Sequence, residues 1–119
     1  MTLDKFTIAY IEAALWSSMD ESTPAGGEPM DANYTIIDLA PETLERMKAD
    51  CAAFQEQNWD DIQDDVTRAG HDFWLTRNHH GAGFWDGDWP EDVDEKLTEA
   101  SHSWGEMDLY VGDDGRVYS

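Results

Sequence analysis

The apolar positions in the first half of the chain recur at intervals of three or four residues, the spacing of one helix face. One such stripe predicts a helix over residues 4–19 and is formed by Ile8, Ile11, Leu15 and Met19. A second stripe follows Pro41, which suits the first turn of a helix, and is formed by Leu44, Met47, Cys51 and Phe54. Residues 20–33 lie between the two stripes, are rich in Pro, Gly and acids, and are expected to form a loop.

A third, short helix is predicted over residues 59–68. Trp59, Ile62 and Val66 would form its inward face. Gly70 follows directly and is the residue type that most often ends a helix, so we expect it to act as the stop.

An aromatic-rich segment in the second half of the chain predicts a β-hairpin. Residues 71–77 (HDFWLTR) hold aromatic and β-branched side chains, which favour a strand. Residues 78–83 (NHHGAG) would turn the chain, and residues 84–86 (FWD) would pair back. From the inward phase of these strands, we expect Trp74 and Trp85 to be buried.

The last third of the chain predicts one helix and a second hairpin. The helix spans residues 91–104 and turns Leu97 toward the core. Residues 107–111 and 116–118 flank an Asp-Gly turn signal, with Leu109 inward. The fold class that follows is α+β, a single acidic domain in which a small antiparallel sheet of two hairpins is covered by about four helices.

Charge is the feature of the composition that indicates which partners the protein could bind. The chain has 27 Asp and Glu against 7 Lys and Arg, a formal net charge of −20. Such a chain is repelled by nucleic acid and by anionic membranes, so neither is expected as a direct partner. It attracts basic surfaces, including those of proteins that grip nucleic acid. The acidity also suits a more general role in solubility or adaptation to high salt.

Part of this charge is arranged in rows four residues apart. Like charges at that spacing destabilise a helix by roughly 0.2–0.5 kcal/mol per pair, which a basic partner would relieve. We therefore expect an acidic surface that binds a basic nucleic-acid-binding host protein as a mimic of DNA phosphates. Its acids should form one continuous face, or two faces joined in a homodimer. The residues are Asp60, Asp61, Asp64, Asp65, Asp88, Glu91, Asp92, Glu95 and Glu99.

An alternative site lies in the predicted hairpin, where polar side chains are dense. They could converge near the ends of the hairpin and bind a ligand, carry out acid–base chemistry or hold an anion. The residues are His71, Asp72, Arg77, Asn78, His80 and Asp86. The structural alternative is that these polar groups serve turns and backbone. His79, His80 and Asp86 lack the spacing of a known metal motif, so no metal or cofactor is expected.

The expected location is the cytoplasm. No apolar run approaches the roughly 20 residues that span a bilayer. Met1 to Lys5 lacks a basic region followed by a long apolar stretch, so no signal peptide is expected. Cys51 is the single cysteine, cannot form an internal disulfide and is expected in the core.

Four segments resemble a family of small acidic proteins from phages and other bacterial mobile elements. They are YIEAALWSS, DANYTIIDLAPETL, AGHDFWLTRNHHGAGFWD and LYVGDDGRVY. The resemblance covers most of the chain, apart from the 20–30 loop and part of the 56–70 region. The family pattern has Gly where this chain has His79. The resemblance implies a phage or plasmid accessory protein, a class that often counters host restriction or CRISPR systems, sometimes by DNA mimicry. With the acidic rows, this context leads us to expect a binding protein more than an enzyme.

Overall fold

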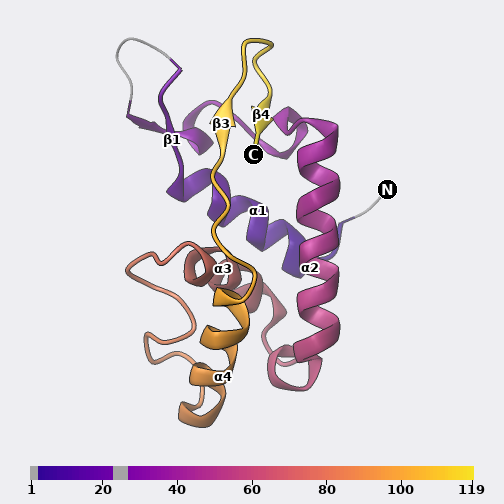
Figure 1. Cartoon of the computed structure of the whole chain (residues 1–119), viewed down its shortest axis with the longest axis vertical. Coiled ribbons are helices and arrows are strands. Elements are labelled where there is room, and N and C mark those ends of the chain that lie inside the picture. The colour runs from indigo at the N-terminus through magenta and orange to yellow at the C-terminus, as the bar shows by residue number, and fades with distance from the viewer. Residues whose placement is uncertain (1–2, 23–26) are drawn as a thin grey trace.

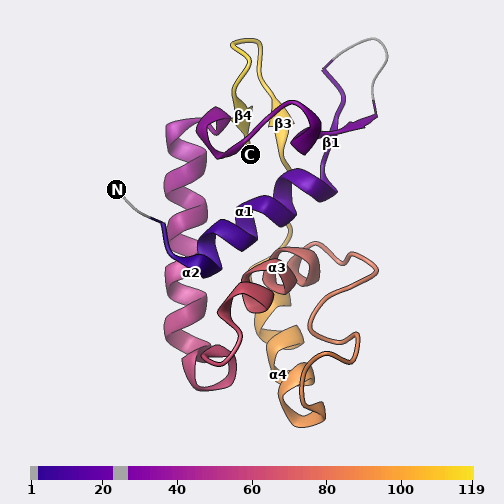
Figure 2. The ribbon, with the colours of Figure 1, turned by 180° about the vertical axis from the view of Figure 1, so that it is seen from behind.

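The computed structural model describes residues 3–22 and 27–119. Within these residues the chain forms four α-helices: α1 (Lys5–Ser17), α2 (Pro41–Ile62), α3 (Val66–Arg77) and α4 (Glu91–His102). The long helix α2 runs along one side of the molecule, and α1 crosses it near the middle (Figure 1). Seen from behind, α1 lies in front with α3 beside it, and α4 lies below α3 (Figure 2). None of the helices in the described ranges is both long and apolar enough to cross a membrane.

Two antiparallel pairs of very short strands complete the fold, which is α+β as predicted. Their members are β1 (Met19–Asp20) with β2 (Glu28–Pro29), and β3 (Tyr110–Val111) with β4 (Val117–Tyr118). The second pair is the predicted C-terminal hairpin. The first pair falls at the two ends of the predicted 20–33 loop, of which residues 23–26 lie outside the described ranges. Two 3₁₀ turns follow β2, at Met30–Ala32 and Ile36–Asp38.

The helix α1 is apolar around most of its circumference. Asp4 caps it, because its side chain accepts a hydrogen bond from the Thr7 N–H at 2.8 Å. Phe6 and Tyr10 are fully buried on its inner face. The predicted helix over 4–19 runs two residues past the end of α1 at Ser17, because Met19 belongs to β1 and is exposed.

The predicted separate helix over 59–68 is wrong, because residues 59–62 are the last turn of α2 and residues 66–68 begin α3. Helix α2 kinks at Asn58, which has φ −126° and ψ 15° and whose side chain donates to the Phe54 carbonyl at 3.0 Å. After Ile62 a short turn leads to α3. Trp59 therefore lies on the outer side of α2, 48% exposed, rather than in the core.

Gly70 is also not a helix stop, since it lies inside α3, where that helix crosses α1. A Cβ atom at this position would lie 2.1 Å from the backbone oxygen of Phe6. Glycine is therefore the residue that lets the backbones of α1 and α3 meet at this crossing.

The predicted 71–86 hairpin is wrong as well, because residues 71–77 complete α3 and residues 78–90 form a long irregular loop. Helical winding places Phe73, Trp74 and Arg77 against the core, a gain in burial that outweighs the strand preference of the aromatic residues. Trp74 is buried as predicted, at 1% exposure, whereas Trp85 lies on the loop and is 49% exposed.

Stacked aromatic rings fill the centre of the molecule. Phe54 of α2 stacks on Phe73 of α3 with ring centroids 4.1 Å apart, and Phe84 of the loop lies 5.9 Å from Phe54. The predicted burial of Leu97, Leu109 and Cys51 is confirmed. Burial raises the pKa of the Cys51 thiol well above its usual range, so this side chain is an inert part of the core.

The C-terminal strand closes the core beside the start of α2. Val117 is fully buried and forms a parallel bridge with Leu39, and its carbonyl accepts a hydrogen bond from the Ala40 N–H at 2.8 Å. Residues far apart in the sequence thus complete one packing unit.

Candidate functional site

Helix α4 contacts the last turn of α2 through its one lysine. Lys96 of α4 donates to the Asp61 carboxylate at 2.6 Å, which joins the two helices. In Figure 1 the C-terminal end of α2 and helix α4 lie toward the same end of the molecule. The carboxylate also raises the pKa of Lys96, first through the hydrogen bond and then through its charge. This contact joins the two helices that carry six of the predicted acids, and we call these six residues the α2–α4 acidic surface: Asp60, Asp61, Glu91, Asp92, Glu95 and Glu99.

The structure keeps the predicted row of acids on α4 but not the two predicted pairs in residues 60–65. Glu91, Glu95 and Glu99 do share one helix at intervals of four residues. Asp60 lies in the last turn of α2, but Asp64 lies in the turn that follows, so these two acids do not stack on one helix.

The second predicted pair, Asp61 and Asp65, is separated in the same way. Asp65 is the N-cap of α3, and its side chain accepts from the Arg68 N–H. The repulsion expected between acids four apart is therefore absent in this stretch, because the helix that would impose it ends at Ile62.

Arg68 joins two of the remaining acids. Its guanidinium lies 3.1 Å from Asp65 and 3.0 Å from Asp88, and the hydrogen bond to Asp65 followed by the charge of Asp88 raises the pKa of Arg68. These three residues line a cleft of about 400 Å³ together with Glu12, His71 and Asp86. We call it the α3 cleft. Two acids predicted for the partner surface are thus already paired within the protein.

The residues of the alternative ligand site are placed by α3 and by the loop that follows it. His71, Asp72 and Arg77 belong to α3, Asn78 is its C-cap residue, and His80 and Asp86 lie in the loop. They do not converge. His71, Asp72 and Asp86 border the α3 cleft, whereas Asn78 and His80 line a separate small pocket beside the C-terminal segment.

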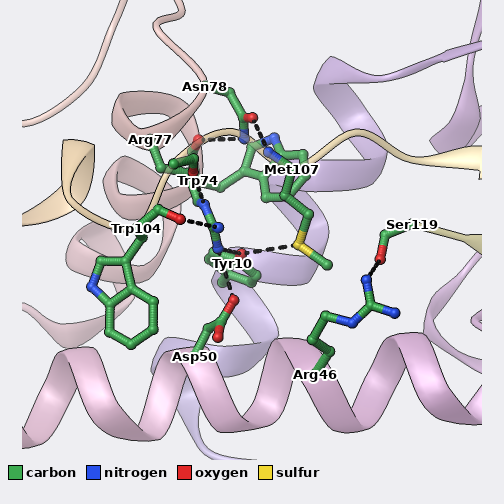
Figure 3. Close-up of polar contacts among 10 residues, drawn as sticks. Tyr10, Arg46, Asp50, Trp74, Arg77, Asn78, Trp104, Met107 and Ser119 are labelled. Atoms are coloured by element: carbon green, nitrogen blue, oxygen red, sulfur yellow. Dashed lines mark hydrogen bonds and ion pairs between the residues drawn. The ribbon is translucent and has the colours of Figure 1, made fainter.

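Arg77 lies in the interior, 4% exposed, and is held on several sides (Figure 3). Its guanidinium donates to the carbonyls of Gly105 at 2.8 Å and Trp104 at 3.1 Å. It also donates to the Tyr10 hydroxyl and the Asp50 carboxylate, each at 2.9 Å. A buried guanidinium with so many internal acceptors is satisfied without a ligand.

The neighbours of Arg77 fasten the segment after α4 to the rest of the protein. The Tyr10 hydroxyl contacts the Met107 sulfur at 3.7 Å, and the Met107 N–H donates to the side-chain oxygen of Asn78 at 2.8 Å (Figure 3). Burial raises the pKa of Tyr10 far above its usual range, against the opposing charge of Arg77, so the phenol stays neutral. This cluster holds the fold together.

Asp72 is likewise used to hold the 78–90 loop. It is buried and accepts a hydrogen bond from the indole N–H of Trp89 at 2.7 Å. One turn along α3, the Thr76 hydroxyl accepts from the Phe84 N–H at 3.0 Å. Asp86 accepts from the Gly83 N–H at 3.4 Å, a contact within the loop. Asp72, Thr76 and Asp86 are thus engaged in holding the 78–90 loop, as the structural alternative expects for these side chains.

Histidines gather without forming a metal site in the described part of the chain. His79 has a positive φ of 57° and stacks on His102, with ring centroids 4.4 Å apart. Glu106 approaches His79 only to 4.0 Å. Across residues 3–22 and 27–119, no group of three His, Cys, Asp or Glu side chains is placed to hold a metal ion.

A surface that the sequence reasoning missed is an apolar groove on the outer side of α1. It has a volume of about 790 Å³ and we call it the α1 groove. Ile8 and Trp16 of α1 form one wall, and Tyr34 and Ile36 form the other. Trp16 is 56% exposed and Ile8 is 39% exposed. The sequence did contain a pattern that indicates this surface. Ile8 and Trp16 lie on one face of α1, and the opposite face is apolar as well, so one apolar face had to lie outside the core.

Comparison with known proteins gives no match to a family model, a curated protein or a solved structure. The resemblance to small acidic phage proteins therefore stays a prediction. The structural features that could serve a function are the α2–α4 acidic surface, the α3 cleft and the α1 groove.

Proposed function

We propose that the protein binds a basic, nucleic-acid-handling host protein through the α2–α4 acidic surface, as a mimic of DNA phosphates. The observation that supports the proposal is the 2.6 Å contact between Lys96 of α4 and Asp61 of α2, which joins the two helices that carry these acids. Residues 86–99 hold seven acids and one lysine, and that lysine is already engaged by Asp61. Asp88 of this segment is paired with Arg68, and its other carboxylates have no basic side chain beside them among the described residues, so they can attract a cationic partner.

The physical gain on binding is relief of repulsion. Glu91, Glu95 and Glu99 follow one another along α4 at a spacing that costs roughly 0.2–0.5 kcal/mol per like-charged pair. A partner that places Lys or Arg between them removes this cost and adds attraction. The association should be fast and should weaken as salt is added, because exposed charges are screened. An accessory protein of a phage or plasmid is the context that the sequence resemblance suggests.

The test compares two variants with equal net charge. The first replaces Glu91, Glu95 and Glu99 with Gln, and the matched control replaces Glu21, Glu42 and Glu106 with Gln. Each changes the net charge from −20 to −17, since three negative charges are removed. Tagged forms of both are used to capture proteins from host lysate at low and high salt, and the affinity of the captured protein is then measured with purified components.

The expected result is that the α4 variant binds the partner at least about tenfold more weakly, while the control binds as the unmodified protein does. The α4 variant should also show a smaller dependence on salt. Equal weakening of both variants would show that only overall charge matters, as a solubility or salt-adaptation role implies. A double variant with His71→Ala and His80→Ala should bind normally; its failure, with the α4 variant silent, would favour a site near α3.

A further inference from the structure

The α1 groove is an apolar surface on a protein of strongly acidic composition. A helix that is apolar all round is normally covered on every side. The inner face of α1 packs on α2 and α3, but Ile8 and Trp16 on its outer face remain exposed. Large exposed apolar side chains that line a common groove mark interaction surfaces in soluble proteins. Figure 2 shows α1 on the near side of the molecule, with the 30–38 segment beside it.

The surroundings of the groove are acidic. Glu12 and Asp31 line it directly, and His71 stands at its edge with its ring 6.0 Å from that of Trp16. Glu12 and His71 also line the α3 cleft, so the groove and the cleft adjoin at these two residues. Among the described residues, Glu12, Asp31 and Asp86 have no basic side chain paired with them. The apolar groove therefore opens onto a surface with unpaired negative charge.

We propose that the α1 groove and the α3 cleft together bind an amphipathic basic helix of a partner protein. A large apolar side chain of that helix lies in the groove between Trp16 and Ile36, and its Lys or Arg side chains face Glu12 and Asp86. This is the helix-in-groove mode of recognition, in which apolar residues at helical spacing supply the anchor. The charged residues set the orientation and the rate of association.

The charge selects this occupant over a second copy of the chain. Two copies of a protein with a net charge of −20 repel one another, and this repulsion opposes pairing through a groove whose border is itself acidic. A basic helix gains attraction at the same border. The proposal does not depend on the α2–α4 acidic surface, because neither Trp16 nor Glu12 belongs to it.

The probe for the experiment is a synthetic helical peptide with leucine on one face and lysine on the other, carrying a fluorescent label. A second peptide has the same composition with its leucines scattered, so that it keeps the charge and loses the apolar face. Binding is followed by fluorescence anisotropy in about 0.15 M salt, where long-range attraction is largely screened. Trp16→Ala tests the groove. Trp85→Ala is its control, since Trp85 is a similarly exposed tryptophan on a different segment.

The amphipathic peptide should bind the unmodified protein at least about tenfold more tightly than the scattered peptide. Trp16→Ala should weaken the amphipathic peptide about tenfold, whereas Trp85→Ala should leave it unchanged. Glu12→Gln should weaken binding less than Trp16→Ala does and should reduce its salt dependence. Ile8→Ser is a second groove variant, used if circular dichroism shows that Trp16→Ala does not fold.

Three results would overturn the proposal. Equal affinity for the two peptides would show that charge alone attracts them. Equal loss in the Trp16 and Trp85 variants would show that the groove is not the binding surface. Sedimentation of the unmodified protein as a dimer that Trp16→Ala dissociates would show that a second copy covers the groove. The Gln variant of Glu91, Glu95 and Glu99 should bind the peptide normally, so failure here is distinct from failure of the proposed function.

Discussion

Replacing Gly70 with alanine should destabilise the protein, although alanine is the better helix former. Gly70 lies inside α3, so the change to alanine gains about 1 kcal/mol of helix propensity. The added Cβ atom, however, would lie 2.1 Å from the Phe6 oxygen and 2.9 Å from the Phe6 carbonyl carbon. Both atoms belong to the backbone of α1, so no side-chain rotation can relieve the overlap.

The two effects can be weighed against each other. Overpacking in a core costs typically 1–3 kcal/mol and occasionally more. Because the neighbour is a helix backbone, α1 and α3 must separate along their crossing, and the cost should reach about 3 kcal/mol or more. After the gain in propensity, a net loss of about 2 kcal/mol remains. At about 4 °C per kcal/mol for a domain near this size, the melting temperature should fall by about 8 °C.

The assay is urea unfolding followed by circular dichroism, with a thermal scan as a second measure. Gly81→Ala is the matched control, because a Cβ atom at Gly81 would meet nothing within 4 Å. The control should be neutral or slightly stabilising, since alanine reduces the freedom of the unfolded chain. If Gly70→Ala were as stable as the control, the close contact between α1 and α3 would be refuted.

Three further predictions concern charge and burial. Arg77→Met should reduce the free energy of unfolding in urea by about 3–5 kcal/mol, because it leaves the Asp50 carboxylate and the Trp104 carbonyl without their donor; an unchanged value would contradict the buried network. Asp4→Ala should cost about 1 kcal/mol at pH 7. Burial acts to raise the pKa of Asp4, but hydrogen bonds from Thr7 and Gln55 outweigh it and lower the pKa below 3.8. Its stabilisation is therefore present above pH 3.8 and is lost as the pH falls through the folded-state pKa, so the acid part of the unfolding profile should flatten in the variant. The melting temperature of the unmodified protein should rise between 0.1 M and 1 M NaCl, as the Debye length falls from about 10 Å to about 3 Å; a flat response would mean that the charges are locally compensated.

The sequence predicted those elements whose pattern is local. The spacing of Leu97 on α4 and the Asp-Gly turn between β3 and β4 are both properties of a short window, and both are confirmed. The prediction of a strand over residues 71–77 failed. The residue types in this stretch favour a strand, whereas packing of their side chains against the core favours a helix. Ala69, Phe73 and Arg77 are four apart, a helical period that was present in the sequence but was outweighed by β propensity.

The candidate site was harder to predict because its contacts join distant parts of the chain. Arg77 pairs with Asp50 and with the Tyr10 hydroxyl, 27 and 67 residues away, and no local pattern indicates these partners. The contact between Asp61 and Lys96 spans 35 residues. Sequence spacing identified the acids of α4, but it could not show which acids are already neutralised by Lys96 or Arg68.

The closure of the core by Val117 has a consequence for synthesis on the ribosome. Tyr10 and Arg77 form hydrogen bonds with Met107 and Trp104, and the start of α2 forms one with Val117. Helices synthesised early therefore cannot reach their final packing until these late residues have left the exit tunnel. During that interval the apolar faces of α1 and α2 are exposed together, which is when a nascent chain is most prone to aggregate. The many acids spread along the nascent chain oppose that association, because like charges keep neighbouring chains apart until the last strand docks.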